Sequence, residues 1–153
     1  MVEKIRIALL GLWLGVMAFF SFVVAPAAFS VLPSGQLAGN VVNRTLGITE
    51  LIGLVLGVTI LLLLLAARSR YGKRFEAITL LLMIISTLVS RFVVSAKLHQ
   101  MREQFGDISA LAKTEATRIA FDQLHQYSVW LMSFNLLAAL VLLVMLIRRR
   151  SDV

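Results

Sequence analysis

The chain has 153 residues, of which 59% are apolar and only 15% are charged, and its mean hydropathy is +0.91. Soluble globular domains carry about 25% charged residues, so this composition excludes a soluble protein. The net charge of +7 raises nucleic-acid binding as a function, but we expect none because the basic residues gather at the ends of apolar stretches. With no cysteine in the chain, disulfides and thiolate metal sites are excluded as well.

Four apolar stretches are each long enough to cross a bilayer core about 30 Å thick, which takes about 20 helical residues. They cover roughly residues 5–32, 46–67, 77–96 and 127–147 and consume most of the chain. The first stretch starts like a signal peptide but is longer than a cleavable apolar segment, so we expect it to be retained. The sequence therefore predicts an all-α fold, in which residues 1–153 form one integral membrane domain built as a four-helix transmembrane bundle.

The charged residues predict the orientation of this bundle. Basic residues outnumber acidic ones at the N-terminus, in the second loop and at the C-terminus, whereas the two signs nearly balance on the other side. The basic positions are Lys4, Arg6, Arg68, Arg70, Lys73, Arg74, Arg148, Arg149 and Arg150. By the positive-inside rule, both termini are expected in the cytoplasm of a bacterium, with the protein in the inner membrane. The basic excess also favours contact with anionic membrane lipid.

The connections between the stretches differ in character. The first, from Pro33 to Arg44, is rich in turn residues, and Pro26 and Pro33 are expected to bend or end the first helix. The second, from Arg68 to Arg74, is tight and basic. Residues 22–25 (FVVA) and 92–95 (FVVS) echo each other at similar depths. Either chance or a duplicated hairpin accounts for that echo.

The third connection, residues 97–123, is polar but favours helix, with a break only at Gly106 and Asp107. Glycine suits a helix C-terminal cap, and Asp107 or Ser109 suits the N-cap of the next helix. The pattern predicts that the third and fourth helices extend beyond the membrane into an extracytoplasmic helical hairpin.

Arg91 is the only charge between Ala77 and Ala96. Because a guanidinium in hydrocarbon needs an anion, carbonyls or water, such a charge is expected to face the protein interior. Counting about 1.5 Å per residue from the cytoplasmic ends places Arg91 about 22 Å deep and Glu50 about 25 Å deep, so the two are predicted to pair. Glu50 shares a helix face with Gly53 and Gly57.

Glycines spaced four apart let helices approach closely. We expect the first two helices to pack through Gly11 and Gly15 against Gly53 and Gly57. A homodimer through such glycine faces is a further expectation.

Polar residues form two stripes that are expected to face each other. Thr87, Arg91, Ser95 and His99 follow at four-residue steps on the third helix. His125, Ser128, Met132 and Asn135 share one face of the fourth helix. Together they predict an outward-facing polar cleft, whose residues either bind a ligand or simply join the helices by hydrogen bonds and fix their register.

His99, Met101 and His125 are the residues that could hold a metal. Imidazole and thioether suit Cu(I), and two histidines can also ligate haem iron. Their spacing matches no diagnostic motif, so we expect no cofactor and keep copper or haem as an alternative. Motifs for nucleotide binding, zinc proteolysis or a nucleophile elbow do not occur, and the protein is expected not to be an enzyme.

Two segments, residues 11–42 and 121–135, resemble the transmembrane protein 205-like family of small four-span membrane proteins of unknown function. In the first segment the matching positions are Trp13, Gly15, Ala25, Pro26, Ala27, Ala28, Phe29, Leu32, Ala38 and Gly39. In the second they are Phe121, Leu124, His125, Ser128 and Asn135. Gln126 stands where that family often has glycine. The resemblance implies the four-span fold and a loose association with copper-resistance-like membrane proteins, but no reaction.

The sequence thus predicts a membrane protein that binds or helps to move a small solute, ion or lipid through the outward-facing cleft. Arg91 would hold an anionic group, and Glu50, His125 and Asn135 would shape the site, with Thr87, Ser95 and Ser128 beside them. The alternatives are a copper- or haem-binding protein that uses His99 and His125, and a structural or interaction subunit.

Overall fold

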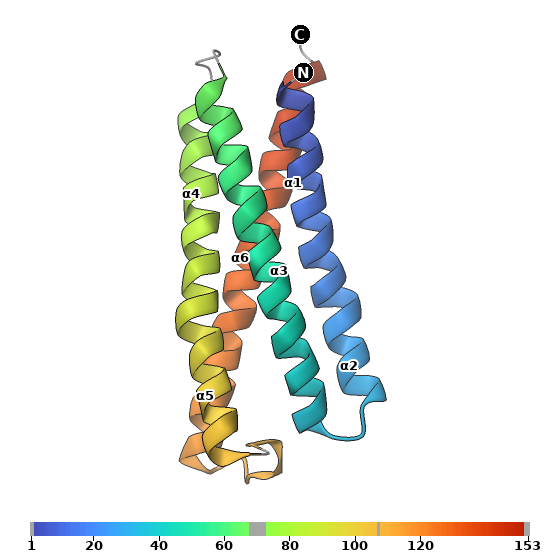
Figure 1. Ribbon diagram of the computed structural model, residues 1–153, viewed down its shortest axis with the longest axis vertical. Helices are drawn as coiled ribbons and strands as arrows, with labels where there is room; N and C mark the ends of the chain where they lie inside the picture. The colour runs from blue at the N-terminus through green and yellow to red at the C-terminus, as the bar shows by residue number, and fades with distance from the viewer. Residues whose placement is uncertain (1, 68–72, 107, 152–153) are drawn as a thin grey trace.

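Four long helical rods run side by side, and the chain reverses direction between successive rods (Figure 1). The computed structural model describes residues 2–67, 73–106 and 108–151. In chain order the elements are α1 (Val2–Phe19), the π-helical turn η1 (Phe20–Val24), α2 (Ala25–Val31), α3 (Gly35–Ala66), α4 (Lys73–Val89), the π-helical turn η2 (Ser90–Ser95), α5 (Ala96–Phe105), the 3-10 turn η3 (Ile108–Ala110) and α6 (Ala116–Ser151). We call the end that carries the N-terminus the terminal end, and the opposite end the loop end.

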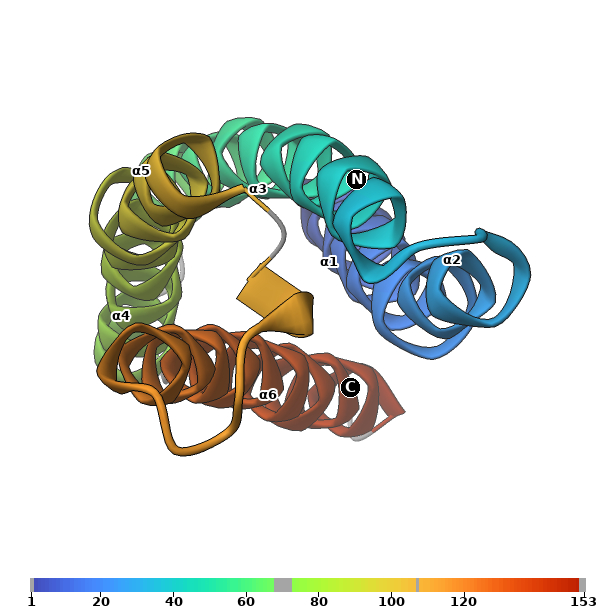
Figure 2. The same ribbon diagram turned by 90° about the horizontal axis from the view of Figure 1, so that it is seen from below.

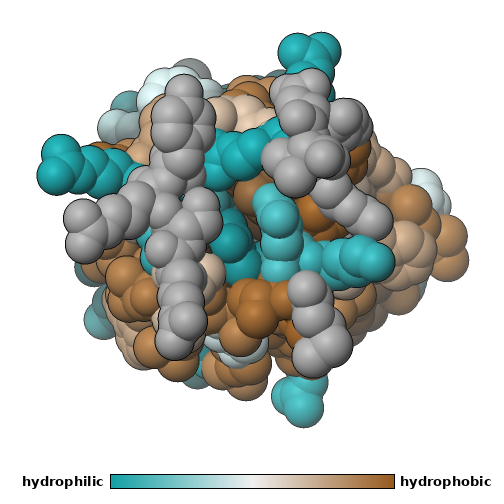
Figure 3. Space-filling model, turned by 90° about the horizontal axis from the view of Figure 1, so that it is seen from above, coloured by the Kyte–Doolittle hydropathy of each residue, from teal (hydrophilic) through white to brown (hydrophobic). Residues whose placement is uncertain are grey.

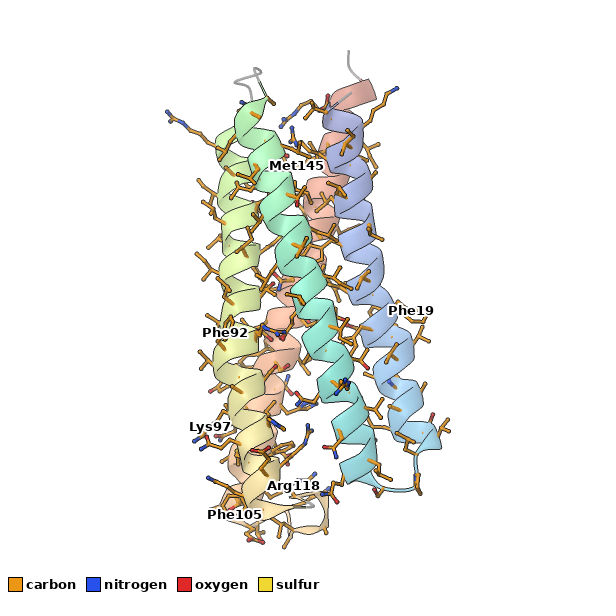
Figure 4. The ribbon with its side chains drawn as sticks, viewed as in Figure 1. Phe19, Phe92, Lys97, Phe105, Arg118 and Met145 are labelled. Atoms are coloured by element: carbon orange, nitrogen blue, oxygen red, sulfur yellow. The ribbon has the colours of Figure 1, made fainter. Side chains whose placement is uncertain are left out.

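The prediction of an all-α protein with four membrane-spanning helices is confirmed. Each rod is long and apolar enough to cross a membrane, and at most 39% of its apolar window is buried inside the bundle. Large apolar side chains such as Phe22 (73% exposed), Phe92 (66%) and Leu65 (65%) therefore cover the flanks. Phe19 points away from the bundle in the same manner (Figure 4). A continuous apolar surface of this kind is stable in lipid rather than in water.

The half of the bundle nearer the terminal end has a closed apolar core. Its members are Leu10, Trp13, Met17, Leu56, Ile60, Leu64, Leu80, Met83, Ala139, Leu142 and Leu146, all 9% exposed or less. They come from α1, α3, α4 and α6 at helical spacing, so each rod turns one stripe inward. A buried ion pair lies beyond this core, toward the terminal end.

That ion pair joins Arg6 of α1 to Glu76 of α4, and both side chains are buried. The two residues therefore neutralise each other instead of adding to the charge of the terminal end. Hydrophilic residues gather over that end of the molecule (Figure 3). Of the basic residues used to predict the orientation, Arg68 and Arg70 lie outside the described residues.

Trp13 packs α1 against α3 by lying across two glycines. A Cβ atom added to Gly53 would lie 2.6 Å from Trp13 Nε1, and one added to Gly57 would lie 2.9 Å from the indole Cη2. The prediction that Gly53 and Gly57 form an interior face is therefore confirmed. The predicted contact with Gly11 and Gly15 is wrong, because both glycines face open space beside an apolar groove. The Trp13 indole fills the space beside Gly53 and Gly57 that the glycines of α1 were expected to occupy.

Two predicted connections differ from the structure. The segment taken as the first loop is mostly helical, because α3 begins at Gly35, where the Ser34 hydroxyl accepts a hydrogen bond from the Leu37 amide at 3.2 Å. Gly106 ends α5 with φ +66°, as predicted. The next long helix begins only at Ala116, so Ser109 is not its N-cap, and Asp107 lies outside the described residues. The second loop, residues 68–72, is likewise not described.

Both segments that echo each other in sequence form π-helical turns. FVV of residues 22–24 lies in η1, and FVVS of residues 92–95 lies in η2. Pro26 lies two residues beyond the end of η1 and lacks the N–H that a regular helix would use, which accounts for the wider turn there. No proline follows η2, and this turn instead places two serines beside the Glu50 carboxylate.

Candidate functional site

Glu50 of α3 is a buried carboxylate, with 4% of its surface exposed. It faces the third rod, which consists of α4, η2 and α5. Its Oε1 atom accepts a hydrogen bond from Ser90 Oγ at 2.6 Å, and Ser95 Oγ lies 3.5 Å from the same oxygen. Its Oε2 atom lies 4.0 Å from Arg91 Nη1. We call these four residues the Glu50 cluster.

The π-helical turn η2 explains how two serines five residues apart reach one oxygen. On a regular α-helix, positions i and i+5 differ by about 140° and face different directions. The wider turn from Ser90 to Ser95 brings both hydroxyls to the side of Glu50. Single π-helical turns recur at functional sites in proteins.

Arg91 has partners inside the protein. Its Nη1 donates a hydrogen bond to the Gly47 carbonyl at 2.7 Å, which is closer than the Glu50 carboxylate. The side chain is 33% exposed, and its guanidinium carbon lies 5.9 Å from the centroid of the Phe92 ring. The prediction that Glu50 and Arg91 lie at the same depth and pair is confirmed. The Gly47 carbonyl is a second partner of Arg91, which the depth of the residues did not indicate.

The polar stripes of the third and fourth rods meet at Thr87 and Asn135, which are both buried. Asn135 Nδ2 donates to Thr87 Oγ1 at 3.3 Å, and Thr87 Oγ1 donates to the Met83 carbonyl at 2.9 Å. A cavity of about 20 Å³ separates this pair from Glu50. That volume holds about one water molecule, which the free acceptors Glu50 Oε2 and Asn135 Oδ1 could bind.

The remaining stripe residues are more scattered. Ser128 is buried on the same face of α6 as Asn135, whereas His125 is exposed at the rim of a loop-end cavity. His99 does not join the stripe, because it is exposed and its Nε2 lies 3.2 Å from Glu103 Oε1. Met101 is buried. The described residues contain no group of three or more histidine, cysteine or acidic side chains that could hold a metal.

Arg102 organises a second polar region at the loop end. Its Nη1 donates to the Gly39 carbonyl at 3.1 Å, and its guanidinium carbon lies 5.1 Å from the centroid of the Phe121 ring. The approach to α3 requires glycine, since a Cβ atom on Gly39 would lie 2.8 Å from Arg102 Nη2. The arginine is half-buried and bridges α3, α5 and α6.

Arg102 lines two cavities that open at the loop end. The first measures about 190 Å³ and extends between α2 and α6, past Phe29, Phe121 and His125. The second measures about 580 Å³ and extends along α3 and α5, past Arg44 and His99. Both are also lined by Gln36 and Gly106. We call the two together the loop-end cavities.

The carboxylates that line the loop-end cavities have partners of their own. Asp122 accepts from Arg118 Nε at 3.0 Å, and Glu103 pairs with His99. Arg118 also donates to the Ile108 carbonyl at 3.0 Å and thereby holds η3 over the mouth of the bundle. It lies at the loop end in Figure 4. Within the described residues, Arg102 forms no ion pair with a carboxylate.

Three residues that matter here escaped the sequence reasoning. Ser90 was missed because regular four-residue spacing leaves it off the stripe, and only a π-helical turn brings it to Glu50. Arg102 has no role in the sequence analysis beyond being one of the charges that nearly balance on the outer side, although the small pair Ala38–Gly39 on α3 was a signal for a close approach. The core role of Trp13 could have been inferred from the glycine pair on the neighbouring helix.

Comparison with known proteins shows that Arg102 and the Glu50 cluster both lie within the part of the chain that matches a known family. Residues 8–106 match the family described as a domain of unknown function (DUF4149), a range that runs from α1 to the end of α5. An uncharacterized protein of Aquifex aeolicus (strain VF5) is 37% identical over 103 residues, which make up 67% of this chain and 73% of that protein. No solved structure matches the chain.

Proposed function

This chain belongs to the DUF4149 family, whose function is unknown, and we propose that it is a membrane protein that binds a small anionic group in the loop-end cavities. The observation that carries the proposal is the state of Arg102. Its guanidinium has a carbonyl and an aromatic ring as neighbours, has no carboxylate partner among the described residues, and lines both cavities.

The electrostatics favour an anion at this position. A half-buried guanidinium has lost part of its hydration and keeps five N–H donors, of which the Gly39 carbonyl takes one. A phosphate or carboxylate can accept two of the others in parallel, which is the geometry that arginine recognises best. Arg44 lines the larger cavity and adds a second positive charge.

The site that the sequence favoured, Arg91, is less suited to a ligand. Its guanidinium already donates to the Gly47 carbonyl and lies beside the Glu50 carboxylate, so its charge is largely compensated within the protein. We therefore assign Arg91 to the register of the helices and Arg102 to the ligand.

We propose binding rather than passage through the bundle. The loop-end cavities do not extend into the closed core of the terminal half, where Leu10, Ile60 and Leu80 are at most 1% exposed. The positive-inside pattern supports an orientation with the loop end facing outward and both termini in the cytoplasm of a bacterial cell. The resemblance to the transmembrane protein 205-like family supports the same plan and adds no reaction.

Binding of inorganic phosphate and sulfate to the protein, purified in a neutral detergent, tests the proposal. We expect Arg102→Gln to weaken binding by about ten- to a hundredfold, which is the usual contribution of hydrogen bonds to a charged group. Gly39→Ala keeps the charge but displaces the guanidinium, so it should weaken binding as well. The matched control is Lys97→Gln, which removes an exposed cation of α5 that points away from the bundle (Figure 4).

The control should bind both anions as the unchanged protein does. The proposal is overturned if neither anion binds, or if Arg102→Gln binds them with unchanged affinity.

A further inference from the structure

The bundle is closed at its terminal end but open along one side at its loop end. In the terminal half, α1 packs against both α3 and α6. Beyond η1 the same rod continues as α2, which packs against α3 and lies apart from the start of α6 (Figure 2). The smaller loop-end cavity occupies this side, with Phe29 of α2 on one edge and Phe121 and His125 of α6 on the other.

The opening is rimmed by apolar side chains that face the lipid. Phe29, which lines the cavity, is 54% exposed. On the other edge, the ring of Phe121 lies against the Arg102 guanidinium. A water-soluble anion would gain nothing from such a rim, whereas the acyl chains of a lipid would be in contact with apolar surface throughout.

Two aromatic residues indicate the level of this opening in the membrane. Tyr127 and Trp130 form an edge-to-face pair on α6 with ring centroids 5.7 Å apart, and both are at least half exposed. Tyrosine and tryptophan gather where the hydrocarbon meets the headgroups. His125 lies about 3 Å beyond Tyr127 along the helix and Phe121 about 9 Å beyond, which corresponds to the headgroup layer.

From these observations we infer that the anionic group is the phosphate of an outer-leaflet phospholipid, which enters sideways between α2 and α6. The phosphate binds Arg102, His125 and Gln36 line the space for the rest of the headgroup, and the acyl chains stay in the bilayer beside Phe29. Among the described residues that line this cavity, the Arg118–Asp122 pair is neutral and Arg102 adds a positive charge, which selects an anionic lipid over a zwitterionic one. This inference rests on the proposed function and narrows its ligand.

Lipid enrichment at the opening tests the inference directly. Since the chain has no cysteine, a single cysteine at Phe29→Cys can carry a fluorophore in vesicles of phosphatidylcholine with a minor share of phosphatidylglycerol. The quencher is a nitroxide near the headgroup of one lipid or the other. We expect the phosphatidylglycerol quencher to be several times more effective than the phosphatidylcholine quencher at position 29. The added variant Arg102→Gln should make the two quenchers equal.

Val31→Cys is the matched control, because it lies on the same helix and is exposed to bulk lipid. There both quenchers should act equally. Equal quenching by the two lipids at position 29 overturns the lipid inference, and so does an enrichment that survives Arg102→Gln. If inorganic phosphate still binds in an Arg102-dependent way in that case, the proposed function stands and only its lipid ligand is wrong.

Discussion

The third rod carries two arginines whose surroundings are opposite in kind. Arg91 lies beside a buried carboxylate and donates to a helical carbonyl, and the cavity on the other side of that carboxylate, which Glu50 lines and Arg91 does not, measures only about 20 Å³. Arg102 lies against a glycine and an aromatic ring, and the cavities it lines measure about 190 and 580 Å³. Arg91 lies deeper in its apolar helix than Arg102, but the depth of a charge does not decide its role. The partners of each arginine distinguish a structural role from a binding role.

Removing each arginine should give the largest difference in unfolding free energy between the two regions. Arg91→Leu removes the hydrogen bond to the Gly47 carbonyl and leaves the buried Glu50 carboxylate without its cation. We expect a loss of about 3 kcal/mol, the lower end of the range for buried pairs, because the guanidinium is 33% exposed. Arg102→Leu loses one hydrogen bond to a carbonyl and should cost about 1 kcal/mol. Reversible unfolding of the two variants in mixed micelles measures both values. Equal losses would erase the distinction between the two regions.

The two serines of η2 sharpen the account of the Glu50 cluster. Ser90→Ala removes a hydrogen bond of 2.6 Å to a buried carboxylate, and we expect a loss of about 1.5–3 kcal/mol in unfolding free energy. Ser95→Ala removes a contact of 3.5 Å to the same oxygen and should cost clearly less. The pair serves as its own control, since the substitution is the same in both. A larger loss from Ser95→Ala would mean that η2 is oriented differently.

The glycine pairs offer a comparison of the same kind in the core. Gly53→Ala places a methyl group 2.6 Å from the Trp13 indole and should cost about 1–3 kcal/mol. Gly15→Ala meets open space and should be neutral or stabilising by up to about 1 kcal/mol, because alanine favours helix. The mass of the Gly15→Ile variant in detergent also tests the predicted homodimer, which should dissociate if it packs through Gly11 and Gly15.

The smallest effect is expected at His99. Its contact with Glu103 is exposed on both sides, and such pairs contribute about 0–1 kcal/mol. His99→Ala should therefore lower the free energy of unfolding by less than about 1 kcal/mol in reversible unfolding. Copper or haem added to the purified protein should give no stoichiometric complex in an optical spectrum and metal analysis. A complex lost in both His99→Ala and His125→Ala would revive the metal alternative.

Part of this architecture follows from the sequence and part does not. The count of helices and the common level of Glu50 and Arg91 follow from apolar length and helical rise, which are properties of single segments. The meeting of Thr87 with Asn135 follows from the periodicity of two polar stripes. The start of α3 at Gly35 was missed because the Ser34 cap outweighs the turn-rich composition that follows it.

Features that depend on packing between helices were harder to infer. The π-helical turn η2 shifts the phase of the third rod, so Ser90 turns toward Glu50 and His99 faces outward. Likewise, the role of Arg102 depends on a glycine that precedes it by 63 positions and on a ring from another helix. The turn at η2 has no local signal in the sequence, and the pair Ala38–Gly39 indicates a close approach without identifying Arg102 as the residue that makes it.

The most direct test of the account is the affinity for inorganic phosphate of two variants measured side by side, Arg102→Gln and Arg91→Lys. The lysine keeps the positive charge beside Glu50, so that variant should fold and bind phosphate as the unchanged protein does. Arg102→Gln should fold equally well and bind about ten- to a hundredfold more weakly. Loss of binding in Arg91→Lys together with full binding in Arg102→Gln would contradict the assignment of the ligand to the loop end.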